Sequence, residues 1–207
     1  MADRLISHVF FDIGGVLGTN GWDREQRTAA RERFGLDDDF DQRHAEVVGD
    51  WEAGRLSMDE YLDDTVFYQP RAFARDEFVA FMQAQSAPYP ETIALARRLA
   101  ARSRARGGPV LMTLNNEALE LNVHRIEHFG LRDVFSAFLS SCWLGVRKPG
   151  RAIFHRALGI AGAAPQEVLF VDDRRQNLAP AAALGMRTLH YTDAAALETA
   201  LGAEGLL

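Results

Sequence analysis

Short apolar runs, each followed by a polar residue, are the feature that most restricts the fold of this chain. Residues 8–11 precede Asp12, residues 110–112 precede Thr113, and residues 168–171 precede Asp172. The apolar character of these runs is nearly continuous, which is typical of parallel strands that helices cover on both faces. In such sheets ligands bind beyond the carboxyl ends of the strands, so the three polar residues mark a predicted functional site.

Helical patterns lie between the apolar runs of the predicted core. Apolar stripes at helical spacing occupy residues 93–100 and 178–182, and weaker strand-length runs occupy residues 135–139 and 188–191. Strands that alternate with helices are typical of a parallel sheet. The sequence therefore predicts an α/β fold with a doubly wound, Rossmann-like parallel sheet.

The segment of residues 20–88 has helical patterns without convincing strands. Ser57 and Glu60 have the spacing of a capping box, and apolar residues follow them on one helical face. We therefore expect an α-helical insertion, or cap, at residues 20–88. The α/β core is expected to comprise residues 1–19 and 89–207.

The composition of the chain excludes several classes of partner and site. With 23 basic and 29 acidic residues, the formal net charge is −6, whereas a sequence-independent grip on nucleic acid needs clustered excess Lys and Arg. Cys142 is the only cysteine, which excludes an internal disulfide and a multi-cysteine zinc site. No stretch approaches the ~20 apolar residues of a membrane span or has the form of a signal peptide, so we expect a cytoplasmic protein.

The polar residues at the predicted sheet edge have the chemistry that phosphoryl transfer needs. Asp12 precedes Gly14-Gly15, a turn whose backbone can approach a ligand closely. Thr113 offers a hydroxyl, Lys148 a positive charge, and Asp172-Asp173 two further carboxylates. A carboxylate nucleophile, a lysine and acids able to bind Mg²⁺ are the groups that transfer through an aspartyl-phosphate requires.

The order of these residues resembles the four motifs of the haloacid dehalogenase (HAD) superfamily. The matching segments are residues 11–17 (FDIGGVL), Thr113, residues 145–149 (GVRKP), and residues 170–173 (FVDD) with Asn177. The similarity covers nearly the whole chain, and the gap between the first two motifs leaves room for the cap. Residues 51–57 (WEAGRLS) look like cap sequence from the branch that holds sugar-phosphate phosphatases and the phosphatase domain of bifunctional epoxide hydrolases.

The resemblance implies a role for each matching residue. Asp12 would be the nucleophile, Lys148 would neutralise the phosphate and orient Asp12, and Thr113 would hydrogen-bond a phosphoryl oxygen. The implied Mg²⁺ ligands are Asp12, the Gly14 carbonyl, Asp172 and Asp173, and the implied phosphate-binding residues are Gly14, Gly15, Thr113, Asn116 and Lys148. The implied reaction is Mg²⁺-dependent hydrolysis of a small phosphorylated metabolite, with a sugar phosphate as one candidate.

Two positions depart from the family pattern. Gly14 stands where most family phosphatases carry a second Asp, which protonates the leaving group and later activates water. Such acid–base catalysis contributes about 10²–10⁴-fold, so we expect leaving groups that need little protonation, or a proton from a cap residue or water. Leu114 follows Thr113 where Asn is frequent, and Asn116 is the candidate replacement.

Two other functions stay open. A 2-haloacid dehalogenase of the same superfamily needs no metal, but the adjacent acids Asp172 and Asp173 would repel an anionic substrate unless a cation were present. A non-catalytic protein that binds a phosphometabolite or a partner would have lost turnover together with the second Asp. His124 and His128 match a zinc pattern, H-x-x-E-H, but are expected on a polar helix away from the predicted edge. The substrate and the oligomeric state are not determined by the sequence.

Overall fold

A five-stranded parallel sheet forms the centre of the computed structural model, which describes residues 5–207. Its strands are β1 (His8–Phe11), β2 (Val110–Asn115), β3 (Ala137–Ser140), β4 (Val168–Asp172) and β5 (Arg187–His190), in the order β3-β2-β1-β4-β5. β1 pairs with β2 on one side and with β4 on the other. The strand order therefore reverses beside β1, which is where sheets of this kind bind ligands.

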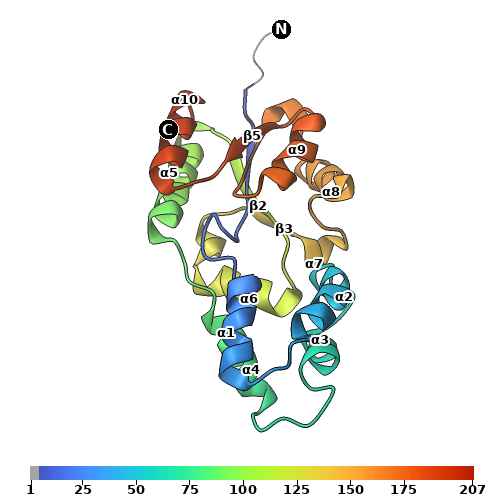
Figure 1. The fold of residues 1–207 in the computed structure, drawn as a ribbon. Helices are drawn as coiled ribbons and strands as arrows, with labels where there is room; N and C mark the ends of the chain where they lie inside the picture. Colours follow the sequence, from blue (N-terminus) through green and yellow to red (C-terminus); the bar gives the residue numbers. More distant parts are fainter. Residues whose placement is uncertain (1–4) are drawn as a thin grey trace.

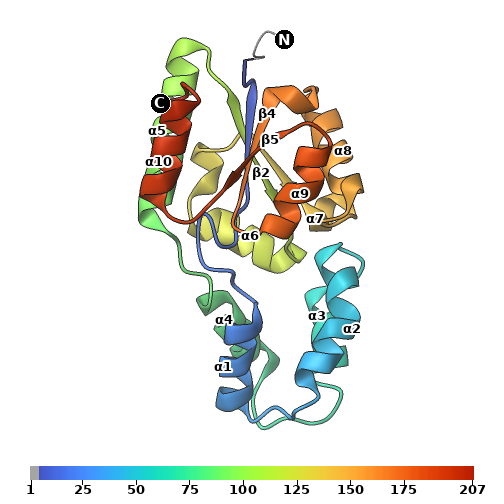
Figure 2. The same cartoon turned by 45° about the horizontal axis from the view of Figure 1, so that its top comes forward.

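Helices cover both faces of the sheet, which confirms the predicted doubly wound α/β fold (Figure 1, Figure 2). The two layers comprise α5 (Pro90–Arg106) and α10 (Ala194–Ala203) on one face, and α8 (Arg151–Ala161) and α9 (Arg175–Ala183) on the other. Alternate residues of β1 serve the two layers: Val9 and Phe11 pack in the cluster that contains α5 and α10, whereas Phe10 packs in the cluster with α8 and α9. Burial on both faces explains why this strand is apolar throughout.

Four helices form the predicted insertion between β1 and β2, and in Figure 2 they lie below the sheet. They are α1 (Arg24–Phe34), α2 (Phe40–Glu52), α3 (Met58–Thr65) and α4 (Arg75–Ala84). The predicted capping box of Ser57 and Glu60 is present at the start of α3. The exact division of the chain at residues 20 and 88 stays a prediction, and residues 1–4 of the predicted core lie outside the described residues.

The insertion has an apolar core of its own that continues onto the sheet domain. Trp51, Tyr61 and Phe78 are buried in this core together with Ala118 and Leu121, which lie at the start of α6 (Leu119–His128). Shared packing at α6 therefore fixes the insertion against the sheet end. None of the helices in residues 5–207 combines the length and the apolar character needed to cross a bilayer.

The predicted end of the second strand, at residue 112, is wrong by three residues. β2 continues through Thr113 to Asn115, and Thr113 pairs with Phe11 of β1 and with Phe138 of β3. The physical reason is that Leu114 is apolar and fully buried, so the apolar run resumes after a β-branched residue that fits a strand interior. The residue that follows this strand is Asn116.

Candidate active site

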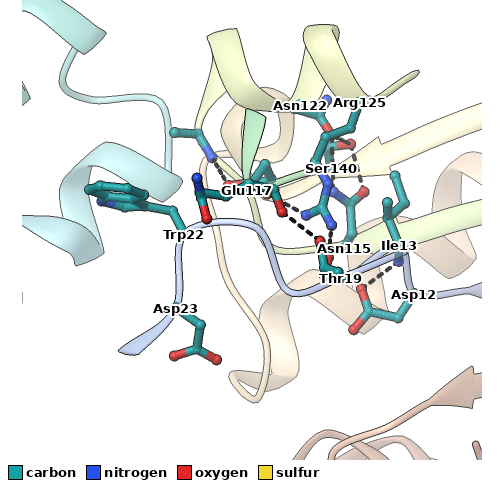
Figure 3. Close-up of polar contacts among 12 residues, drawn as sticks. Asp12, Ile13, Thr19, Trp22, Asp23, Asn115, Glu117, Asn122, Arg125 and Ser140 are labelled. Carbon is teal, nitrogen blue, oxygen red and sulfur yellow. Dashed lines mark hydrogen bonds and ion pairs between the residues drawn. The ribbon is translucent and has the colours of Figure 1, made fainter. Parts of the chain in front are cut away.

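Asp12 is the first residue beyond β1, and the backbone fixes its side chain. It is 7% exposed, and its Oδ1 accepts a hydrogen bond from the amide of Ile13 at 2.8 Å (Figure 3). Its Oδ2 lies 2.8 Å from Nζ of Lys148. These two contacts, one at each carboxylate oxygen, fix the orientation of the Asp12 side chain at the end of β1.

Lys148 joins the ends of β1 and β4. Its Nζ lies 2.8 Å from Asp12 and 2.6 Å from Asp172, and all three residues are buried. Asn116 holds the loop that carries this lysine: its Nδ2 donates to the Lys148 carbonyl, and its Oδ1 accepts from the Lys148 amide, both at 2.8 Å. The amide group of Asn116 is therefore occupied in positioning Lys148.

Three carboxylates converge at this point and form an acidic cluster of Asp12, Asp172 and Asp173. One oxygen from each lies within 4.8 Å of the others. Burial raises the pKa of Asp12 to about 8, Lys148 opposes the rise, and Asp172 adds to it. Burial and Asp172 likewise raise the pKa of Asp173. The single positive charge of Lys148 cannot neutralise three carboxylates. The acidic cluster therefore has the negative charge that a divalent cation would neutralise.

The oxygens of the acidic cluster differ in what they already bind. Oδ1 of Asp172 accepts from the amide of Arg174 at 2.8 Å and from Nδ2 of Asn177 at 3.0 Å, and its Oδ2 lies against Lys148. Oδ1 of Asp173, in contrast, is buried and has no hydrogen-bond partner among residues 5–207. Hard carboxylate oxygens are the ligands that Mg²⁺ prefers, and the unpartnered one on Asp173 is available to such an ion.

The glycine turn after Asp12 lies directly against the acidic cluster. Gly15 has φ +72, and a Cβ added to it would lie 2.2 Å from Oδ2 of Asp173. Both the left-handed backbone and the lack of space require glycine at this position. The turn therefore brings the backbone that follows Asp12 into contact with the end of β4.

A cavity of about 320 Å³ lies between the ends of these strands and the insertion. Of the predicted site residues, Asp12, Gly14, Asn116 and Lys148 line it; the insertion side contributes Trp22, Asp23, Arg27, His44, Val48, Trp51 and Glu52. Thr113 does not line the cavity, because it is fully buried inside β2, and its hydroxyl has no hydrogen-bond partner in the described part of the chain. The structure thus brings the predicted carboxylates and lysine together but leaves Thr113 behind them.

Four arginines of the cavity wall form ion pairs with carboxylates, and the sequence did not predict these pairs. These pairs are Arg27–Asp41 at 2.7 Å, Arg125–Glu117 at 2.7 Å, Arg147–Glu52 at 2.6 Å and Arg174–Asp23 at 2.5 Å. Two of them, Arg147–Glu52 and Arg174–Asp23, join the insertion to the sheet domain. Because the partners in these two pairs are far apart in the chain, no local pattern in the sequence predicts them.

One of these pairs occupies the position at which Gly14 departs from the HAD pattern. Arg125 is 2% exposed, and its Nη1 contacts Oε2 of Glu117 while its Nη2 donates to the Thr19 carbonyl (Figure 3). A Cβ added to Gly14 would lie 3.6 Å from Nη1 of Arg125 and 3.2 Å from Oδ1 of Asn20. A guanidinium group therefore stands where a second aspartate would extend.

The zinc-like pattern of His124 and His128 lies outside this site. Both residues are on α6 and stack on one another with 5.4 Å between ring centroids. Neither lines the cavity, and neither belongs to the acidic cluster.

Comparison with known proteins agrees with the motif order. A family model described as haloacid dehalogenase-like hydrolase matches residues 6–185. The chain is 32% identical to the sesquiterpene phosphatase astK of Aspergillus oryzae over 93 residues, which are 45% of this chain and 47% of that protein. It is 25% identical to the drimenol cyclase drtB of Aspergillus calidoustus over 191 residues, which are 90% of this chain and 34% of that protein. The matched region is thus less than half the length of these two curated relatives.

A solved structure supports the fold. An HAD family enzyme from Bacteroides thetaiotaomicron, in complex with magnesium and inorganic phosphate, has a TM-score of 0.76 to this chain at 21% sequence identity. The match covers 90% of this chain and 94% of that one. Since the family model spans most of the chain and the acids and lysine of its motifs converge on one point, this protein belongs to the haloacid dehalogenase-like hydrolases.

Proposed function

We propose that the protein is a Mg²⁺-dependent phosphatase that releases phosphate from a small phosphomonoester through an aspartyl-phosphate on Asp12. The observation that carries this proposal is the convergence of Asp12, Asp172, Asp173 and Lys148, two of which, Asp12 and Lys148, line a polar cavity. The phosphatase activity in the name of the astK relative and the phosphate-bound neighbour support the reaction type. A place near sugar-phosphate phosphatases and the epoxide hydrolase phosphatase domain is part of the same proposal.

The acidic cluster and the Gly14 carbonyl would hold the cation. Asp173 would bind it directly, because its Oδ1 is buried without a partner, whereas the oxygens of Asp172 already accept hydrogen bonds from Arg174, Asn177 and Lys148. When bound, Mg²⁺ would neutralise negative charge on the phosphoryl oxygens. Asp172 would then act mainly by holding Lys148 in place.

Asp12 would perform the chemistry in two displacements. In the first, its carboxylate oxygen forms a bond to phosphorus, the bond from phosphorus to the leaving oxygen breaks, and that oxygen takes a proton from water. In the second, water attacks phosphorus, phosphate leaves, and the carboxylate is restored. Lys148 would hold a fixed positive charge beside the transferred group during both steps, which stabilises the developing negative charge. Thr113, whose buried hydroxyl has no partner in the described residues, would hydrogen-bond a phosphoryl oxygen, and Gly15 would leave room for Asp173.

Removal of the divalent cation is expected to lower phosphate release from 4-nitrophenyl phosphate by at least about 100-fold, because the metal contributes several kcal/mol of charge stabilisation. Added Mg²⁺ should restore the activity. The Asp173→Asn variant should need at least about tenfold more Mg²⁺ for half-maximal activity, whereas Asp133→Asn, at an exposed position outside the cavity, should match the wild type.

Two further measurements, with and without Mg²⁺, separate the alternatives that the sequence left open. Chloride release from a 2-chloro acid that is indifferent to chelator would favour a haloacid dehalogenase. Thermal stabilisation by Mg²⁺ without phosphate release from any substrate in a metabolite screen would favour a non-catalytic binding protein.

Restoring the family's second aspartate is expected to give no gain in activity. In Gly14→Asp the new carboxylate would meet Arg125, and the positive charge would lower its pKa and keep it ionised, so that it could not protonate a leaving group. A gain of about tenfold or more on hexyl phosphate, with none on 4-nitrophenyl phosphate, should appear only when Gly14→Asp is added to a Glu117→Gln/Arg125→Met background. A tenfold gain in the single variant would contradict this account of Arg125.

A further inference from the structure

A buried tyrosine on α3 organises three residues of the cavity wall. Tyr61 is fully buried; its hydroxyl accepts a hydrogen bond from Nε1 of Trp22 at 2.8 Å and lies 2.9 Å from Nδ1 of His44. Its ring stacks on Trp51 with 3.8 Å between centroids and 8° between planes. Trp22, His44 and Trp51 all line the cavity that contains Asp12.

The contacts of Tyr61 assign the tautomer of His44. The indole of Trp22 only donates, so the tyrosine oxygen accepts from it, and the tyrosine proton is directed to Nδ1 of His44. Burial and, to a smaller extent, the charge of Arg27 together lower the pKa of His44 to about 4, although Asp41 and Asp23 oppose the shift, so the imidazole is neutral near pH 7. A neutral imidazole that accepts at Nδ1 carries its hydrogen on Nε2.

Two hydrogen-bond donors on α2 thus have no acceptor within the part of the chain that the structure describes, residues 5–207. Nε1 of Trp51, a residue that is 1% exposed, is buried without a hydrogen-bond partner among these described residues. The hydrogen bond of His44 within the same residues is made by Nδ1, which leaves Nε2 without one. The two residues are two helical turns apart, which places them on the same side of α2. A buried N–H group without an acceptor is unfavourable, so these donors indicate a ligand that supplies oxygen atoms.

The charges of the wall indicate that this part of the ligand is neutral. Arg27 and Arg147, the arginines that line the cavity near His44 and Trp51, already contact Asp41 and Glu52. A second anionic group would have to compete with these carboxylates. A hydroxyl group needs no such exchange and can accept from both orphan donors.

We propose that His44 and Trp51 determine specificity by donating hydrogen bonds to the hydroxyl groups of a polyhydroxylated leaving group. This inference rests on the proposed phosphatase function and names its substrate class as a sugar or polyol phosphate. Apart from the two indole rings, Val48 and Pro149 are the apolar side chains of the wall. A terpenyl chain would therefore find little apolar surface here, in contrast to the substrate in the name of the astK relative.

Matched pairs of phosphates with and without hydroxyl groups test the proposal. Wild-type protein with Mg²⁺ should have a kcat/KM at least about tenfold higher for glycerol 1-phosphate than for propyl phosphate, or for glucitol 6-phosphate than for hexyl phosphate. Trp51→Phe keeps the stack on Tyr61 but removes the indole N–H. His44→Asn keeps a partner for the Tyr61 hydroxyl but lacks Nε2.

Each variant should lower kcat/KM for the preferred hydroxylated phosphate by about 3- to 10-fold more than it lowers kcat/KM for the alkyl phosphate, the effect of losing one hydrogen bond. Trp143→Phe, at a residue that is 48% exposed outside the cavity, is the control and should change neither. The absence of a preference in both pairs would overturn the proposal, as would equal losses on the two members of a pair.

Binding to a variant that cannot turn over separates this inference from the proposed function. Calorimetric titration of Asp12→Asn should show tighter binding of the preferred hydroxylated phosphate than of its alkyl partner, and Trp51→Phe in that background should remove part of the difference. A binding preference without phosphate release from any substrate supports the recognition and contradicts the phosphatase. Phosphate release without a binding preference supports the phosphatase and contradicts the recognition of hydroxyl groups. If neither phosphate release nor a binding preference is observed, both proposals are rejected.

Discussion

Replacing Asp12 with asparagine is expected to lower the rate of phosphate release by at least about 10⁴-fold, the scale of effect seen when an enzyme loses its nucleophile. The amide has nearly the same shape, and its oxygen can still accept the hydrogen bond from the Ile13 amide. The variant should therefore fold normally but be unable to form an aspartyl-phosphate. Phosphate release from 4-nitrophenyl phosphate in the presence of Mg²⁺ measures the effect.

Two controls make the Asp12 result decisive. Asp133→Asn loses a carboxylate at an exposed position outside the cavity and should match the wild type. Thermal unfolding should show that Asp12→Asn is at least as stable as the wild type, because the substitution removes one of three crowded acids. A residual rate within about tenfold of the wild type would mean that another residue, or water, attacks phosphorus.

Lys148→Met is expected to lower kcat/KM by about 10²–10³-fold, because a fixed charge beside the transferred phosphoryl group is lost. The same change leaves Asp12 and Asp172 buried without their cationic partner. Breaking a buried ion pair in this way typically destabilises a protein by about 3–5 kcal/mol. Urea unfolding should show this loss, and Mg²⁺ should reduce it, since a cation in the acidic cluster replaces part of the missing charge.

Arg151→Met is the matched control for the lysine variant. It removes one positive charge at the exposed first residue of α8, three positions along the chain. Stability and kcat/KM should both stay near the wild-type values. If the two variants were equally impaired, the effect would come from net charge and not from the contacts of Lys148.

The fold was predictable because burial on both faces of a sheet leaves a strong local signal. Val9, Phe10 and Phe11 must all be apolar to serve the two helical layers, and the same holds for β4. The end of β2 was not predictable, since it depends on the register with neighbouring strands. Asn115 still belongs to β2, although it is polar, because its side chain is satisfied by Ser140 and Asn122 at 2.8 and 2.9 Å (Figure 3).

The same contrast holds for the residues of the candidate site: some stand in short sequence motifs, whereas others are brought together only by the fold. Asp12, Lys148 and the two acids at the end of β4 were predicted because each stands in a short motif at a strand end or in a loop. The pairs Asp23–Arg174 and Glu52–Arg147 were missed, because they exist only once the insertion packs on the sheet domain. Their partners lie so far apart in the chain that no spacing rule connects them.

Lys148 is the single lysine of the chain, since the other 22 of the 23 basic residues are arginines. It is also 4% exposed and enclosed by two carboxylates. Apart from the amino terminus, a reagent that acylates primary amines therefore has one shielded target in the whole molecule. Mass spectrometry of the labelled protein would then report how often Lys148 leaves its two carboxylate partners and becomes accessible to the reagent, with no engineered probe.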